Sequence, residues 1–196
     1  MILAIAVILG FIAGLLRAWL SKRAYQLPEL KWVWLVFLAF IPQFLAFNFS
    51  LTRTRVPDNW VPAILIITQV LLLIFVWLNR RQLGFWIMGI GLLCNFAVIA
   101  LNGGMMPISP ETAGRITIPG AMVDLKIGER VEYGKDVLLP EGETRLAFLS
   151  DRFTTPAWFP YSIAFSFGDI LISAGAFLLF WSLGAPAKNF PEVSTC

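Results

Sequence analysis

The sequence has 196 residues, of which 58% are hydrophobic and only 14% are charged. A typical soluble domain is about 45–50% apolar, even with glycine counted, and about 25% charged. A soluble chain of this size has too little interior to bury so many apolar side chains. The composition therefore predicts a multi-pass membrane protein. It excludes a soluble enzyme, a disordered protein and a disulfide-stabilised secreted domain.

Two further features of the composition limit the cofactors and partners. The sequence contains no histidine, which excludes histidine-ligated haem, chlorophyll or metal and every Ser-His or Cys-His catalytic pair. The net charge of +3 is small, so we expect no nucleic-acid partner. We predict no cofactor and no metal site, although a bound lipid or quinone is compatible with the sequence.

Five segments are apolar and about as long as the ~20 residues that a membrane-spanning helix needs. In chain order they are residues 2–20, 32–51, 60–78, 84–101 and 161–184. Residues 102–160 hold 8 acidic and 6 basic residues and several short β-like stretches, with a hairpin turn predicted at Tyr133–Asp136. We therefore predict an all-α integral membrane protein, a five-helix transmembrane bundle with one long, partly β extracytoplasmic loop at 102–160.

The basic residues of the short loops predict the orientation of the bundle. If five helices are threaded through the membrane, most of these residues fall on one side: Arg17, Lys22, Arg23, Lys31, Arg80, Arg81 and Lys188. Only Arg53 and Arg55 lie in the short loop on the other side. The positive-inside rule then predicts an N-terminus outside, residues 102–160 outside, and a cytoplasmic tail at 185–196.

Asp169 is the most informative polar residue within the predicted spans. It lies about eight residues into the fifth predicted span, where an aspartate costs about 2.5–3.5 kcal/mol on insertion scales. Threading the topology gives Asn95, Gln69 and Gln43 a similar depth on three other spans, and Ser166 lies on the same face as Asp169. We therefore predict one polar intramembrane cluster of these five residues. Its neutral members fit hydrogen bonds between helices, whereas an intramembrane ionisable residue is a functional candidate.

Small residues recur every four positions in the first predicted span, where Gly10 and Gly14 form a Gly-x-x-x-Gly motif. This motif lets another helix backbone approach closely. The second helix can belong to this chain or to a partner protein, and the sequence leaves both interpretations open.

Three short segments of the sequence occur together in one known family. They are Asn102–Pro107 (NGGMMP), Thr144–Asp151 (TRLAFLSD) and Ser166–Asp169 (SFGD). With them the chain resembles a family of small bacterial multi-pass membrane proteins known only as a domain of unknown function, family 5317. The resemblance implies a five-helix protein of the bacterial cytoplasmic (inner) membrane with an outside loop. It implies no activity.

A shorter resemblance surrounds Asp169. The pattern Phe-Ser-Phe-Gly-Asp-x-x-Ile-x-x-Gly at residues 165–175 is similar to the last motif of bacterial lipoprotein signal peptidases, Phe-Asn-x-Ala-Asp-x-x-Ile-x-x-Gly. The resemblance implies that Asp169 is one of two catalytic aspartates, with Asp151 as the second. Such a pair shares one proton and activates water. Ser166 and Gly168 depart from the motif, and five spans replace four. Because Asp151 would have to descend into the bundle, we expect the two carboxyl groups to lie more than ~6 Å apart, beyond direct proton sharing.

Three functions are compatible with these features. The first is a non-enzymatic accessory or scaffold subunit that packs against membrane lipids and other membrane protein subunits, for example in a respiratory or photosynthetic complex. The second is a diaspartyl membrane peptidase that uses Asp151 and Asp169. The third is a small transporter or proton pathway through Asp169. No nucleotide-binding loop or zinc-ligand spacing occurs in the sequence.

Overall fold

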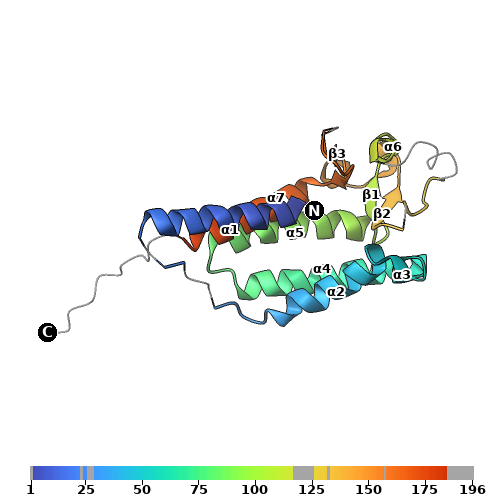
Figure 1. Ribbon diagram of the computed structural model, residues 1–196. Helices are drawn as coiled ribbons and strands as arrows, with labels where there is room; N and C mark the ends of the chain where they lie inside the picture. Colours follow the sequence, from blue (N-terminus) through green and yellow to red (C-terminus); the bar gives the residue numbers. More distant parts are fainter. Residues whose placement is uncertain are drawn as a thin grey trace.

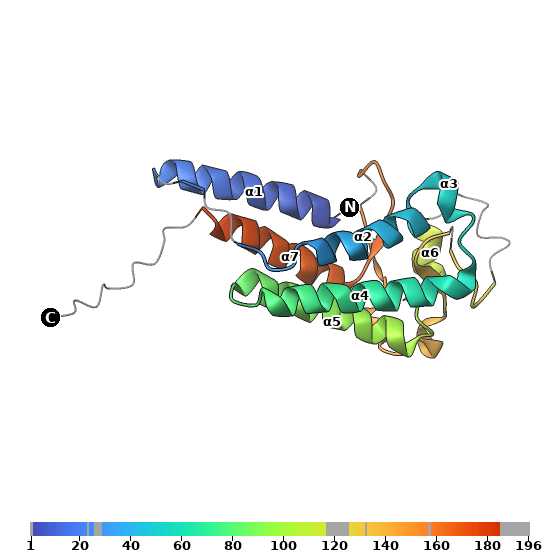
Figure 2. The ribbon, with the colours of Figure 1, turned by 90° about the horizontal axis from the view of Figure 1, so that it is seen from below.

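Among the described residues, five long helices lie lengthwise beside one another, and a small cap covers one end (Figure 1). The computed structural model describes residues 2–22, 24–25, 29–116, 126–131, 133–156 and 158–184. The long helices are α1 (Ile2–Leu20), α2 (Trp34–Phe47), α4 (Val61–Leu78), α5 (Leu83–Leu101) and α7 (Phe167–Ser182). They pack in the order α1–α7–α5–α4–α2, so that α7 lies between α1 and α5 (Figure 2).

Three segments are long and apolar enough to cross a membrane: Ile2–Leu20, Asp58–Leu78 and Leu83–Leu101. The second of them joins the short helix η1 (Asp58–Trp60) to α4. Two further apolar helices, α2 and α7, are shorter. Many large apolar side chains of these helices point outward and are exposed, as expected where lipid replaces water. The chain is therefore a membrane protein built mainly of helices.

Glycines bring α7 into backbone contact with both of its neighbours. A Cβ atom on Gly91 would lie 2.5 Å from the Gly168 carbonyl oxygen, and one on Gly175 would lie 2.6 Å from the Gly84 carbonyl oxygen. These reciprocal contacts make α5 and α7 antiparallel. On the other side, Gly10 and Gly14 of α1 contact the backbone at Phe177 and Phe180, which makes α1 parallel to α7. The glycines of α1 thus pack against a helix of this chain.

The second predicted span, 32–51, is interrupted in the structure. The helix α2 ends at Phe47, and a separate short helix α3 (Ser50–Arg53) follows. Asn48 is a weak helix former, and Phe49 takes an extended backbone conformation that stops the helix. The Thr52 hydroxyl donates to the Leu45 carbonyl, which satisfies one of the acceptors that a helix end leaves free.

The cap is partly β, as predicted for residues 102–160. Its strand β1 (Met106–Ile108) pairs in parallel with β2 (Asp136–Leu138), and β3 (Phe153–Thr154) pairs antiparallel with β4 (Ala164–Phe165). Short helices fill the rest: α6 (Pro110–Ile116), η2 (Glu141–Glu143) and η3 (Ala147–Leu149). An antiparallel bridge between Arg130 and Val137 closes the turn predicted at Tyr133–Asp136.

The fifth helix starts later than predicted, which corrects the position of Asp169. The predicted span was 161–184, but α7 begins at Phe167 because residues 164–165 belong to β4. Ser166 then caps the helix: its hydroxyl accepts from the Asp169 amide at 3.0 Å, and its own amide donates to the Asp169 carboxylate at 3.1 Å. Asp169 therefore lies in the first turn of α7, beside the cap, and not near the middle of a long helix. The predicted tail at 185–196 lies outside the described residues.

Candidate functional site

Asp169 is held by hydrogen bonds from the N-cap of α7 and from a side chain within α5. Besides its capping contacts with Ser166, its carboxylate accepts from the Asn95 side-chain amide at 2.8 Å. The Asn95 carbonyl oxygen in turn accepts from the Ser166 hydroxyl at 2.8 Å. The glycine contacts between α5 and α7 place Asn95 against Gly168, so the close approach of these helices builds the network. A carboxylate in the first turn also interacts favourably with the helix dipole.

Lys135 joins this network to the cap. Its ammonium Nζ lies 2.7 Å from an oxygen of Asp151, 3.8 Å from one of Asp136 and 4.0 Å from one of Asp169. The Lys135 side chain is 35% exposed, whereas that of Asp151 is 0% exposed. We call these four residues with Asn95 and Ser166 the cap–bundle joint, because they connect cap strands to α5 and α7.

The strand β1 positions both cap members of the ion pair. The Met106 amide donates to the Lys135 carbonyl at 3.1 Å, and the Asp151 amide donates to the Pro107 carbonyl at 3.2 Å. A parallel bridge joins Asp151 to Ile108 on the edge of β1. Because β1 pairs with β2 and contacts Asp151, two segments far apart in the sequence carry their charges to the same place.

Asp136 and Asp151 form a carboxyl pair within the joint, because both contact the same Lys135 ammonium, at 3.8 and 2.7 Å. Burial raises the pKa of Asp151 to about 8, and the neighbouring carboxyl groups add to this while the Lys135 ammonium opposes it. Burial also raises the pKa of Asp136. Burial alone would lower the pKa of Lys135, but the carboxylates of Asp151, Asp136 and Asp169 together raise it. Lys135 therefore stays charged.

The structure brings together only part of the predicted polar cluster. Asp169, Asn95 and Ser166 are hydrogen-bonded to one another. The Gln43 amide instead donates to the Thr68 hydroxyl at 2.6 Å, between α2 and α4. The Gln69 side-chain oxygen is buried and has no hydrogen-bond partner in the described part of the chain. The predicted cluster is divided in the structure, because α5 lies between α7 and the pair α4 and α2, which carries Gln69 and Gln43.

The two aspartates of the peptidase interpretation contact the same lysine. Among the described residues no hydrogen bond joins Asp151 to Asp169, and the Lys135 ammonium contacts both. The Lys135 ammonium contacts Asp136 as well, at 3.8 Å. Sequence reasoning treated Lys135 and Asp136 only as turn residues. Their adjacency at the start of a strand was the available signal, but nothing in the sequence shows that this strand pairs with β1.

Two further contacts fix the cap on the helices. Arg130, whose side chain is 4% exposed, pairs with Asp58 at 3.1 Å and donates to the Ala46 carbonyl at 3.3 Å. Asn102, at the end of α5, exchanges two hydrogen bonds of 2.9 Å with the Arg145 backbone. Together with the cap–bundle joint, these contacts anchor the cap by polar side chains at three places.

The described residues contain no group of three or more His, Cys, Asp or Glu that could hold a metal ion.

Comparison with known proteins gives a family but no activity. An uncharacterised protein of Thermotoga maritima is 30% identical over 112 residues, which cover 56% of this chain and 57% of that protein. The chain thus spans little more than half the length of this relative. No solved structure matches the chain. The DUF5317 family, described as a family of unknown function, matches residues 28–181, so the chain belongs to this family.

Proposed function

We propose that the chain is a non-enzymatic membrane protein that works as an accessory or scaffold subunit beside other membrane proteins. This proposal rests on the position of the Lys135 ammonium, which lies in contact with both Asp151 and Asp169. A diaspartyl peptidase needs a water molecule between its two carboxyl groups, and here a side chain of the protein takes that place. Asp151 is also fully buried, so a substrate has no access to it.

The contacts of Asp169 also favour a structural role. Its carboxylate accepts hydrogen bonds from Asn95 and from the Ser166 amide, and these are the contacts of a capping box. Because Asp169 lies at the end of α7 beside the cap, the burial cost that suggested a proton pathway through the helix is reduced.

The outer face of α2 is the surface that we propose for a partner helix. It presents an apolar stripe with mainly aromatic side chains at helical spacing: Trp34, Phe37, Phe40, Ile41 and Phe44, all of which are exposed. Phe40 and Phe44 stack with their ring centroids 5.7 Å apart. Large aromatic side chains lose little entropy on ordering and dominate contacts between proteins. This stripe offers one continuous surface to the helix of another subunit.

A photo-crosslinking experiment in native membranes tests the scaffold proposal. A photoreactive amino acid at Phe37 or Ile41 is expected to give one discrete protein product, and the same group at Leu93, exposed on α5, is not. If all three positions give lipid products only, the proposed partner surface is refuted. Cleavage of a lipoprotein substrate by the purified chain, lost in both Asp151→Asn and Asp169→Asn, would instead favour the peptidase.

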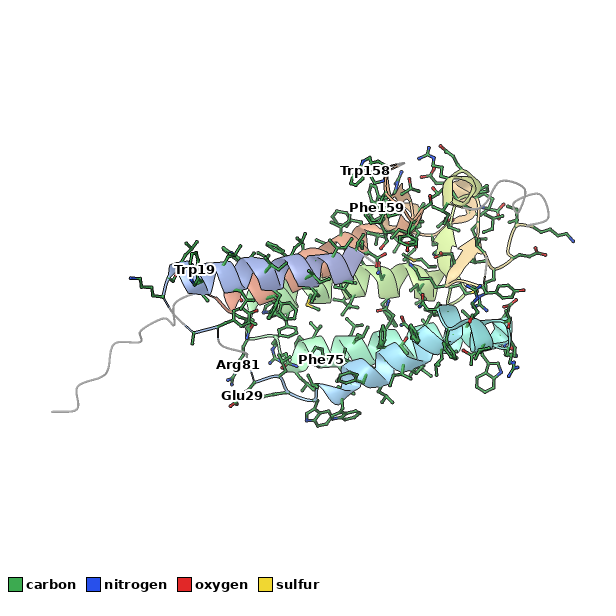
Figure 3. All side chains as sticks on the ribbon, viewed as in Figure 1. Trp19, Glu29, Phe75, Arg81, Trp158 and Phe159 are labelled. Atoms are coloured by element: carbon green, nitrogen blue, oxygen red, sulfur yellow. The ribbon has the colours of Figure 1, made fainter. Side chains whose placement is uncertain are left out.

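For the topology we propose five membrane crossings in the bacterial cytoplasmic membrane, with the N-terminus and cap outside. The parallel packing of α1 and α7, with α5 antiparallel to α7, is what this threading requires. Trp19 and Arg81 lie at one end of the helices, and Trp158 and Phe159 lie at the other (Figure 3). Arg17 and Arg80, near the end away from the cap, cover the rings of Trp181 and Trp77 at 4.3 and 4.2 Å, as expected for interfacial residues.

Cysteine labelling of intact cells tests this topology. In a background without Cys94 and Cys196, an impermeant reagent is expected to label Gly142→Cys in the cap and to leave Ser21→Cys unlabelled until the cells are opened. Both positions are exposed, so accessibility is matched. If Ser21→Cys is labelled in intact cells and Gly142→Cys is not, the orientation is the opposite of the one proposed.

A further inference from the structure

The charges of the cap–bundle joint do not balance. Three carboxyl groups, those of Asp136, Asp151 and Asp169, lie within 4.0 Å of a single ammonium. The strand β1 and the helix α5 add no acidic or basic residue. Buried charges require a partner because the protein interior solvates them poorly. With every group ionised the joint would keep two uncompensated negative charges.

The uncompensated groups can be identified from their contacts. Asp169 accepts hydrogen bonds from Asn95 and Ser166 with both of its oxygens, and it is therefore well satisfied as a carboxylate. One oxygen of Asp151 accepts from Lys135 at 2.7 Å. The other oxygen of Asp151 and one oxygen of Asp136 are buried and have no hydrogen-bond donor among the described residues. Both belong to the carboxyl pair that surrounds the Lys135 ammonium.

We propose that the cap–bundle joint is a proton-binding site, in which Asp136 and Asp151 share one proton bound from the aqueous phase outside the cap. The proton turns a repulsive contact between two carboxylates into a hydrogen bond and gives both unpartnered oxygens a place in it. It leaves two negative charges and one ammonium, with the second carboxylate, Asp169, held by neutral donors at the end of α7. Lys135, which is 35% exposed, gives water access to the site.

The bound proton makes the docking of the cap on the helices sensitive to external pH. The titratable groups that face the carboxyl pair are Lys135 from the turn before β2 and Asp169 from α7. Lys135 remains charged, and Asp169 is already satisfied. Loss of the shared proton therefore leaves Asp136 and Asp151 as adjacent carboxylates that repel each other, and this repulsion acts between cap segments that must stay together around β1.

Infrared spectroscopy of the full chain in lipid nanodiscs tests the proposal. A protonated carboxyl group absorbs at a C=O stretching frequency where carboxylates do not. The wild-type chain is expected to show this band at neutral pH and to lose it as pH rises through about 8. Asp136→Asn and Asp151→Asn are each expected to remove the band, since the remaining carboxyl group then pairs with Lys135 and ionises. Because both variants are measured, the test remains valid if one of them fails to fold.

Two controls and one alternative complete the experiment. Asp169→Asn and Glu143→Gln, the latter exposed on the cap, are expected to keep the band. A wild-type chain with no band at neutral pH, or a band that survives in both Asp136→Asn and Asp151→Asn, overturns the proposal. A thermal unfolding temperature that falls when Na⁺ is replaced by choline at constant pH, without any protonated band, would assign the site to a metal cation instead.

Discussion

The helix α7 is fixed in two different ways along its length. In its apolar part it contacts α5 and α1 through glycines, whose missing side chains allow backbone to touch backbone. At its N-terminal end its Asp169 contacts Asn95 of α5 and Lys135 of the cap, through hydrogen bonds and charge. The first contact is specified by shape and the second by charge. Changes in the first should therefore act at every pH, whereas changes in the second should depend on protonation.

The largest effect is expected from filling the glycine contact. A side chain at Gly91 meets the Gly168 carbonyl oxygen at 2.5 Å, and backbone cannot yield as a flexible side chain does. Gly91→Leu is expected to lower the free energy of unfolding by about 3 kcal/mol, at the upper end of the cost of overpacking. Thermal or denaturant unfolding in micelles at two pH values measures this loss.

Gly142→Leu is the matched control, because a side chain at Gly142 meets nothing within 4 Å. It is expected to leave stability within about 0.5 kcal/mol of the wild type. Equal losses in the two variants would show that the contact between α5 and α7 is looser than described.

A somewhat smaller effect is expected from removing the ammonium of the joint. Lys135→Met leaves the buried Asp151 carboxyl group without its partner, which costs about 3–5 kcal/mol for a fully buried pair. Because Lys135 is partly exposed, we expect about 2 kcal/mol. Hydrogen exchange should rise at the Asp151 amide, which bonds to β1, and should not change in α1. Lys126→Met, at an exposed cap position, should alter neither, and unchanged exchange at Asp151 in Lys135→Met would contradict the ion pair.

The pH dependence distinguishes the two contacts directly. The pKa of Asp151 is raised from 3.8 to about 8 in the folded chain, so the folded state binds the proton more tightly than the unfolded state. The resulting stability is complete below about pH 3.8 and is lost as pH rises through about 8. The slope is at most about 1.4 kcal/mol per pH unit for one proton. Hydrogen exchange of the cap should therefore accelerate toward pH 8 beyond the intrinsic rate, and Asp151→Asn should flatten this change.

The smallest effect is expected at the helix cap. Ser166→Ala removes the acceptor of the Asp169 amide and is expected to cost about 1 kcal/mol, as for other N-cap residues. Ser182→Ala, at the other end of α7, removes a hydroxyl that only donates to the Leu179 carbonyl, and it should cost less. A larger loss in Ser182→Ala would show that the capping box contributes little to the start of α7.

The apolar segments of the sequence were enough to predict the bounds of most long helices. The helices α1, α4 and α5 coincide within one residue with the predicted segments 2–20, 60–78 and 84–101, because an apolar segment of this length can satisfy its backbone only as a helix in lipid. The sequence also placed Asn95 and Gln69 at the depth of Asp169, and the structure bonds Asp169 to Asn95.

Only the tertiary structure decided the composition of the joint. The start of α7 depends on the pairing of β3 with β4, and the meeting of Lys135, Asp136 and Asp151 depends on β1. These strands are two or three residues long, and such short strands carry no periodicity that would reveal their partners. Hydrophobicity is a property of each segment by itself and can be read along the chain. The neutralisation of a charge depends on which distant segment lies beside it, and that is fixed only when the chain folds.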